Sequence, residues 1–517
     1  MTMAGSFPVD QRRTLRRFRS LNSLLLTLPP HFQSPLIDVR SRLATFAFLV
    51  AARRTSSPRH LKLARLLMPK RIPLDRAIHF SRGSIKQIVK AADPDRLKQT
   101  ITELAAMVPG QIWPAVLAIE CGTALGDAEF AGKLLGALHD SGTLLPKLHA
   151  AQLAALQAAG PSPRAALNIL APYAPTHERA RREVSLDAEI SLIKANATCE
   201  NEAHWASHVQ QLFVGTGLSP LELPQSHSDG SSHFDLLGRA RSTRPKSTSG
   251  PLVSVIVTCF NGERYIEAAL HSLREQTHAN LEILVVDDCS PDGSAAIAAR
   301  LAREDPRIRL LRNPKNVGTY VSRNRAVRLS RGAYVTTQDA DDWSHPERIA
   351  RQVARLEASP RAIADYCVGV RMTAGGRFEM VRPGRLLDSV CYPSLMYRKS
   401  TALRRIGYWD CVRVEADSEY VMRLTQLYGR QVVLGWHQPL VVQLRRDGSL
   451  TTDLRTQITG GAVGEDRKTY RAAVRKFHAR MTKATGHYDF ENWQRPFPAP
   501  AGIAVSEDLV REALSWD

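Results

Sequence analysis

Between residues 251 and 342, short apolar runs alternate with segments whose apolar residues recur at helical spacing. The runs predict four strands, at 254–258, 281–286, 309–311 and 334–338. The intervening segments predict three helices, at 265–276, 295–304 and 320–330. This alternation is typical of a mostly parallel sheet with helices on both faces, that is, an α/β fold. Ligands in such sheets bind beyond the carboxyl ends of the strands, so we expect a site there.

Carboxylates follow two of these strands. Asp287 and Asp288 end the second, while Asp339, Asp341 and Asp342 end the fourth. Left bare in a partly buried cleft they would repel one another by an energy on the order of several kcal/mol. A hard divalent cation and the hydrogen-bonding groups of a nucleotide would remove that repulsion. A single Asp pair is more often a helix cap or turn, but two clusters at equivalent strand ends favour a ligand site.

The first 220 residues have a helical pattern. Three segments, at 92–101, 126–135 and 160–169, align at a constant offset of 34 residues. Thirty-four residues is the length of a tetratricopeptide unit, whose stacked helices would offer a surface to a protein partner. A generic helical bundle remains the alternative. A further helix pair is expected at about 184–195 and 202–213.

Charge is concentrated near the N-terminus of this chain, whose net charge is +20. Residues 1–90 hold 18 Lys and Arg against three acids. Five arginines between 12 and 19 precede five leucines between 21 and 28, which suits an anionic membrane surface better than a nucleic-acid backbone. We find no nucleic-acid recognition motif, and therefore expect no nucleic-acid partner. Without a signal peptide or an apolar run near 18 residues, we expect a cytoplasmic protein, peripheral on the inner face of the membrane through residues 1–30.

Ordered motifs extend across residues 253–449. They include Val253-Ser-Val-Ile-Val-Thr-Cys-Phe-Asn261, Glu282-Ile-Leu-Val-Val-Asp-Asp-Cys-Ser290, Gln338-Asp-Ala-Asp-Asp342, Glu415-Ala-Asp417 and Arg445-Arg-Asp-Gly-Ser449. Together these motifs resemble the glycosyltransferase family 2 domain of the nucleotide-diphospho-sugar transferase (GT-A) fold. The resemblance implies transfer of a sugar from a nucleotide-diphosphate sugar to a hydroxyl of a saccharide or lipid-linked saccharide, in bacterial polysaccharide or glycolipid biosynthesis.

The resemblance also implies roles for the strand-end residues in binding the donor. Thr258 and Phe260 would line the base pocket, and Asp288 would hydrogen-bond the edge of the base. Asp339 would lie near the ribose and the metal, and Asp341 would hold Mn²⁺ or Mg²⁺ against the phosphates. The remaining donor-binding positions are Asn261, Glu263 and Asp287.

For the transfer step, the resemblance makes Asp417 the general base, and one base with one displacement implies inversion. Asp447 stands where many members have a histidine, and His437 is a weak substitute for it. Because the Gln-x-x-Arg-Trp element of processive synthases is missing, addition of one or a few sugars is favoured. The alternatives are a non-catalytic scaffold and a sugar nucleotidyltransferase, whose Gly-rich loop the segment 259–264 does not match.

The sequence therefore suggests five regions. A basic arm with helices at 1–90 precedes an all-α, repeat-like domain at 91–224. Residues 225–250 are rich in Ser, His, Gly, Arg and Pro and are typical of a linker. The GT-A domain would span 251–453, and a basic helical extension would complete the chain at 454–517.

Overall fold

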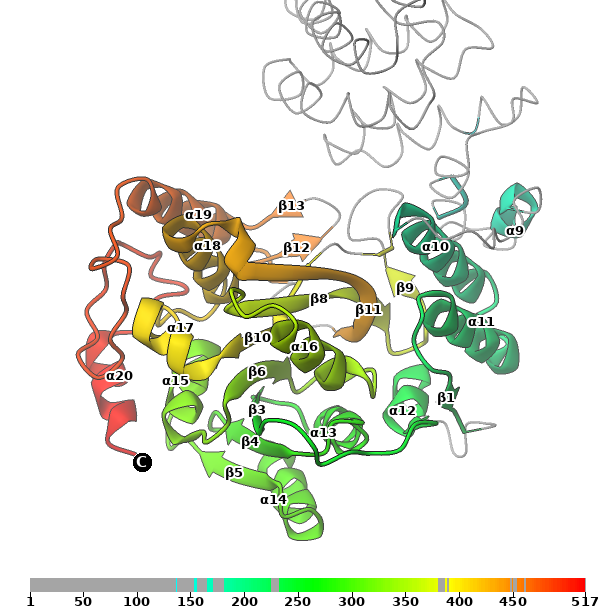
Figure 1. The fold of residues 1–517 in the computed structure, drawn as a ribbon, viewed down its shortest axis with the longest axis horizontal. Helices are drawn as coiled ribbons and strands as arrows, with labels where there is room; N and C mark the ends of the chain where they lie inside the picture. Colours follow the sequence, from blue (N-terminus) through cyan, green and yellow to red (C-terminus); the bar gives the residue numbers. More distant parts are fainter. Residues whose placement is uncertain are drawn as a thin grey trace, which may run out of the picture. The chain divides into compact units, whose positions relative to one another are not determined.

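The computed structural model describes residues 136, 153–155, 165–170, 181–224, 232–379, 386–387, 390–446, 449, 453–459 and 462–516 (Figure 1). The chain divides into two compact units, residues 1–145 and 146–517, and the elements below belong to the second. The arm at 1–30 lies outside the described residues, as do the segments with the 34-residue offset except 165–169. In the part of the chain that is described, no helix combines the length and apolarity needed to cross a bilayer.

Four parallel strands form the first half of a nine-stranded sheet, in the order β5-β4-β3-β6. They are β3 (Val253–Cys259), β4 (Leu281–Asp287), β5 (Ile308–Arg312) and β6 (Tyr334–Asp339). Every residue of β3 and β4 is buried, which explains why both appear in the sequence as continuous apolar runs. The four predicted strands are confirmed.

Helices cover both faces of these strands, as predicted. The connecting helices are α13 (Ile266–Arg274), α14 (Ser294–Glu304) and α15 (Thr319–Leu329). Alternate residues of β3 enter different cores: Val255 packs in the core that contains Ile266 and Ala298, and Ile256 packs in the one that contains Val321. The period-two geometry of a strand thus separates two layers of helices.

The second half of the sheet is mixed. β10 (Cys391–Arg398) is antiparallel to β6 and β8, and β11 (Val433–Arg445) is parallel to β8 and antiparallel to β7. The other elements of this half are β7 (Asp342–Ser344), α16 (Arg348–Glu357), β8 (Ala364–Thr373) and β9 (Phe378–Glu379).

The last part of the chain packs against the sheet domain. Tyr470, Val474 and Trp493 are buried in the same core as Trp409 and Tyr420. The elements here are α17 (Lys399–Ile406), α18 (Ala416–Tyr428), η1 (Arg430–Val432), β12 (Ile458–Thr459), β13 (Ala462–Val463), α19 (Glu465–His478) and α20 (Glu507–Leu514).

Helices that precede the sheet also contact it. The predicted helix pair is present as α10 (Arg181–Ala197) and α11 (Glu202–Gly215), which follow α9 (Ala165–Leu170). Two of their side chains form hydrogen bonds here: Asn196 of α10 with Phe378 of β9, and Trp205 of α11 with the carbonyl of Gly376, in the turn between β8 and β9.

The segment 225–250, which the composition suggests is a linker, contains secondary structure. Its elements are α12 (His233–Gly238) and β2 (Arg241–Ser242), and β2 pairs with β1 (Leu221–Glu222). A capping box between Ser232 and Asp235 starts α12, which packs on α13. The domain boundaries drawn from composition stay predictions.

Candidate active site

The two carboxylate clusters lie at one edge of the sheet. In the strand ladder Asp287 pairs with Cys259, and Asp339 pairs with Thr258. Because β4 and β6 flank β3 in parallel register, their carboxyl ends, and the carboxylates on them, reach the same level. The sequence-predicted residues of β3, β4 and β6 are therefore brought together.

Asp288 is buried and accepts hydrogen bonds from four donors. Its Oδ1 accepts from Asn313 Nδ2 at 2.7 Å, from Val317 N at 3.0 Å and from Ser322 Oγ at 3.1 Å. Its Oδ2 accepts from Gly318 N at 2.7 Å. A carboxylate offers about four acceptor positions, so Asp288 fastens the loop that begins α15. The neighbouring Asp287, by contrast, has a buried Oδ1 with no hydrogen-bond partner among the described residues.

The loop after β3 forms an exposed rim beside these carboxylates. Phe260 is 45% exposed, and Asn261 has a left-handed backbone with φ of 52°. Asn261 N donates to Ser290 Oγ, and Glu263 Oε2 accepts from Gly293 N at 3.0 Å. The loop is thus tied to the loop after β4, and an aromatic ring is left facing solvent.

Arg323 of α15 pairs with the strand-end cluster and carries a positive charge that acts on Asp417. Its Nη2 lies 2.6 Å from Asp339 Oδ1, and its guanidinium stacks 5.1 Å from the centre of the Tyr320 ring. Burial raises the pKa of Asp417, the positive charge of Arg323 opposes this rise, and the negative charge of Glu415 adds to it. Asp417, in the first turn of α18, is therefore influenced by the charge of the same arginine that pairs with Asp339.

Asp341 lies beside a cation that sequence reasoning did not select. Its Oδ2 accepts from Arg446 Nε at 2.7 Å, and the Arg446 guanidinium lies 5.7 Å from the Tyr265 ring centre. Burial raises the pKa of Asp341, Arg446 opposes the rise and Asp339 adds to it. Asp342 is buried with its Oδ2 unpartnered among the described residues, and burial raises its pKa well above the usual range.

Comparison with known proteins identifies the family. Residues 254–412 match the family model described as glycosyl transferase family 2. The chain is 38% identical over 190 residues to the putative teichuronic acid biosynthesis glycosyltransferase TuaG of Bacillus subtilis, covering 36% of this chain and 71% of TuaG. The chain belongs to glycosyl transferase family 2. The resemblance found in the sequence is therefore confirmed.

Other similarities are shorter or looser. The chain is 37% identical over 149 residues to the putative glycosyltransferase EpsE of Bacillus subtilis. The aligned segment covers 29% of this chain and about half, 52%, of EpsE. A solved mannosyltransferase of Pyrobaculum calidifontis, in complex with GDP-Man and Mn²⁺, is 20% identical, with 52% of this chain and 70% of that chain covered and a TM-score of 0.31.

The side chains that would take part in binding a divalent cation are the carboxylates at and just after the end of β6. No group of three or more His, Cys, Asp or Glu side chains is placed to bind a metal within the described ranges. Mg²⁺ is usually held by one or two protein carboxylates together with substrate phosphates, and Asp341 would be one carboxylate of this kind. Asp342 is buried, whereas Asp339 and Asp341 are partly exposed, and the mutual repulsion of these three carboxylates fits such a cation.

Sequence reasoning missed Arg323 and Arg446. Arg446 immediately precedes Asp447, the position where a histidine is usual. A positively charged residue next to that position was the available signal for Arg446. Asp447 lies outside the described residues; for His437, in β11, the structure describes only the backbone. Arg323 belongs to an Arg-Asn pair within α15, and no local pattern indicates that it pairs with Asp339.

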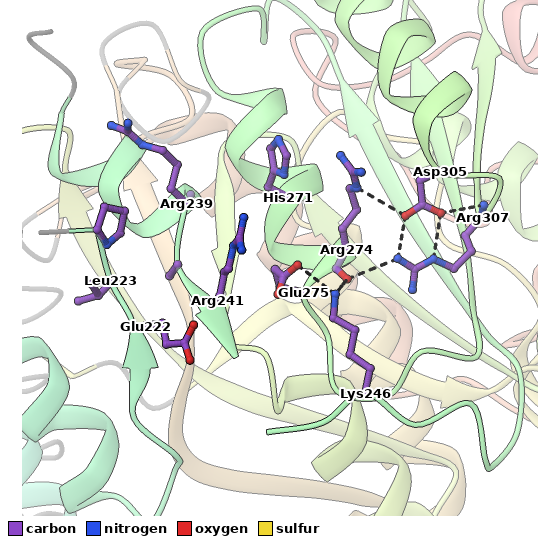
Figure 2. A pocket seen from close by; sticks show the side chains of 13 residues that line it. Glu222, Leu223, Arg239, Arg241, Lys246, His271, Arg274, Glu275, Asp305 and Arg307 are labelled. Carbon is purple, nitrogen blue, oxygen red and sulfur yellow. Dashed lines mark hydrogen bonds and ion pairs between the residues drawn. The ribbon is translucent and has the colours of Figure 1, made fainter. Parts of the chain in front are cut away.

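A separate pocket of about 660 Å³ lies away from the carboxylates (Figure 2). None of the predicted site residues lines it. Figure 2 shows two of the ion pairs at its wall: Lys246 with Glu275 at 3.0 Å and Arg307 with Asp305 at 2.7 Å. These pairs come from the amino-terminal sides of β3 and β5, whereas the carboxylates gather at the carboxyl ends of the strands.

Proposed function

We propose that this chain transfers a sugar from a nucleotide-diphosphate sugar to an acceptor hydroxyl, with inversion at the anomeric carbon. One observation carries this proposal: Arg323 pairs with Asp339, at the end of β6, and its positive charge also acts on Asp417, at the start of α18. A donor-side carboxylate and a candidate base thereby border the same space. Holding two reactants in this way turns a bimolecular reaction into an effectively unimolecular one.

The donor would bind along the carboxyl edge of the sheet. The exposed ring of Phe260 offers a stacking surface for the base beside Thr258, with Asn261, Glu263, Asp287 and Asp288 shaping this end of the site. Asp341, with Asp339 beside it, would hold Mn²⁺ or Mg²⁺. When bound, that cation would supply positive charge to the diphosphate, which carries more negative charge as it leaves.

The transfer step would be a single displacement. The acceptor oxygen attacks the anomeric carbon as Asp417 takes the proton from that oxygen. The bond between the anomeric carbon and the diphosphate oxygen breaks, and its electron pair leaves with the nucleoside diphosphate. Attack from the face opposite the leaving group inverts the carbon. Burial of Asp417 raises its pKa, which makes the carboxylate a stronger base.

The acceptor we propose is a saccharide or lipid-linked saccharide. Support comes from the similarity to a protein described as a teichuronic acid biosynthesis glycosyltransferase. The arginine- and leucine-rich segment 1–30 would bring the enzyme to an anionic membrane surface, where such an acceptor would be found. A protein partner on the helices before residue 225 remains part of this proposal.

Asp417→Asn and Asp341→Ala test the two assignments. We expect Asp417→Asn to bind UDP or GDP normally in calorimetry but to lose about 10²–10⁴-fold in turnover, because the proton acceptor is gone. Asp341→Ala should lose transfer and bind the nucleoside diphosphates more weakly in the presence of Mn²⁺. Asp508→Asn on α20, whose side chain is 90% exposed, is the matched control. Turnover of Asp417→Asn within tenfold of the parent enzyme, or full activity in excess EDTA, would contradict the respective role.

A further inference from the structure

Residues beyond 464 bind the acidic side chains around the candidate base. Asp410 Oδ1 accepts from Arg495 Nη1 at 2.9 Å, and Asp410 Oδ2 accepts from the Tyr470 hydroxyl at 2.7 Å. Glu419 Oε1 lies 2.9 Å from His478 Nε2. Asp410 and Glu419 are both fully buried. The segment 410–419, which carries Asp417, is therefore fastened to the C-terminal part of the chain on both sides of that residue.

The central contact of this kind involves Glu415. Arg471 donates to both of its carboxylate oxygens, from Nε to Oε2 at 2.8 Å and from Nη2 to Oε1 at 2.8 Å. Arg467 Nη1 donates to Oε1 at 2.5 Å. Such a forked arrangement fixes both the distance and the orientation of a carboxylate.

Glu415 also has an uncommon backbone. Its φ is 75°, in the left-handed region that residues with a Cβ rarely adopt. It is the residue before α18, and its carbonyl accepts from Glu419 N at 3.1 Å in the first turn of that helix. The two arginines of α19 therefore hold Glu415, which immediately precedes α18 and lies two positions before Asp417.

We propose that Arg467 and Arg471 are positioning residues for the transfer step, which hold Glu415 and thereby orient the Asp417 carboxylate at the start of α18. Both arginines lie beyond residue 412, where the match to the family model ends. The segment 465–478 is then part of the catalytic domain, and the domain's base is supported by a helix outside the family motifs. This inference rests on the proposed role of Asp417.

The charges around Asp417 give the proposal a measurable signature. The titratable and charged groups that interact electrostatically with Asp417 are Tyr320, Arg323, Glu415, Arg467 and Arg471. In Arg471→Gln, Glu415 keeps its negative charge but loses its forked partner. The repulsion of Asp417 then increases, so the acidic limb of the pH profile of kcat should move to higher pH.

The experiment compares Arg471→Gln with Arg475→Gln, an exposed arginine on the same helix. Release of nucleoside diphosphate is measured against pH, using whichever of UDP-glucose, UDP-N-acetylglucosamine and GDP-mannose the parent enzyme turns over fastest. We expect Arg471→Gln to lose at least tenfold in kcat, with the donor KM within twofold, and to show the shifted limb. Arg471→Lys should recover part of the loss, and the double variant Glu415→Gln, Arg471→Gln should return the limb toward the parent position.

A second measurement needs no donor. Amide hydrogen exchange across 415–420 should be faster in Arg471→Gln than in Arg475→Gln, because the start of α18 is released. Equal exchange in the two variants, or a kcat and pH limb in Arg471→Gln equal to those of Arg475→Gln, would overturn the proposal. If Asp417→Asn is inactive while Arg471→Gln behaves as its control, only the positioning role fails. If Asp417→Asn keeps its turnover, the base assignment itself fails and this inference fails with it.

Discussion

Asn196 of α10 provides a test of whether the helices before residue 225 stabilise the transferase sheet. Its Nδ2 donates to Phe378 O at 2.7 Å, and its Oδ1 accepts from Phe378 N at 2.6 Å. Asn196 is 4% exposed and Phe378 is 3% exposed. One side chain thus satisfies both backbone groups of a residue in β9.

Asn196→Leu keeps nearly the same volume and removes both hydrogen bonds. A buried backbone group left without a partner costs about 1–3 kcal/mol, so losing two partners should lower the free energy of unfolding by about 2–6 kcal/mol.

Urea unfolding followed by far-ultraviolet circular dichroism measures this loss, with Ser207→Ala, at an exposed position of α11, as the control. We expect a lower midpoint for Asn196→Leu with an unchanged slope, since the surface exposed on unfolding is the same. Midpoints for the two variants that agree to within the equivalent of about 0.5 kcal/mol would refute the reasoning, because substitutions away from any special feature typically change stability by no more than that.

Three further predictions follow from single residues. Burial raises the pKa of Asp365 to about 7, although Arg355 lies 3.4 Å away, so the folded state binds this proton more tightly than the unfolded state. Stability from this group is therefore greatest below about pH 4 and falls until about pH 7, by about 4 kcal/mol at most, and Asp365→Asn should remove that slope in urea titrations at pH 5 and pH 8. Arg446→Gln frees the Asp341 carboxylate from a charge-assisted bond of about 1.5–3 kcal/mol, so Mn²⁺ alone should bind about tenfold or more tightly in calorimetry; an unchanged affinity would mean that Arg446 does not compete for that carboxylate. Phe260→Ala should weaken UDP or GDP binding by about 1–3 kcal/mol through lost stacking, while the unfolding midpoint stays the same, and equal nucleotide affinity would exclude a stacking role.

The sequence predicted the first half of the sheet because that half is encoded locally. Strands such as β3, buried on both faces, must be apolar throughout, and the helices between them must present apolar residues at helical spacing. The sequence also predicted that the carboxylates at 287–288 and 339–342 lie close together, because parallel strands bring their carboxyl ends to one edge of the sheet. Composition alone was less informative for 225–250, where a capping box at Ser232 and the apolar residues of α12 were signals of a helix within a polar stretch.

The contacts that complete the candidate site were decided only by tertiary structure. Three ion pairs are of this kind. Arg323 of α15 pairs with Asp339, and Arg446, next to the end of β11, pairs with Asp341. Arg471 of α19 pairs with Glu415. Arg467 and Arg471 are four residues apart and so share one face of a helix, but that spacing does not say which acid the face will meet. Local periodicity indicates which side of an element is buried. It does not indicate which two charged residues far apart in sequence will pair, because the packed core sets the distance between their elements.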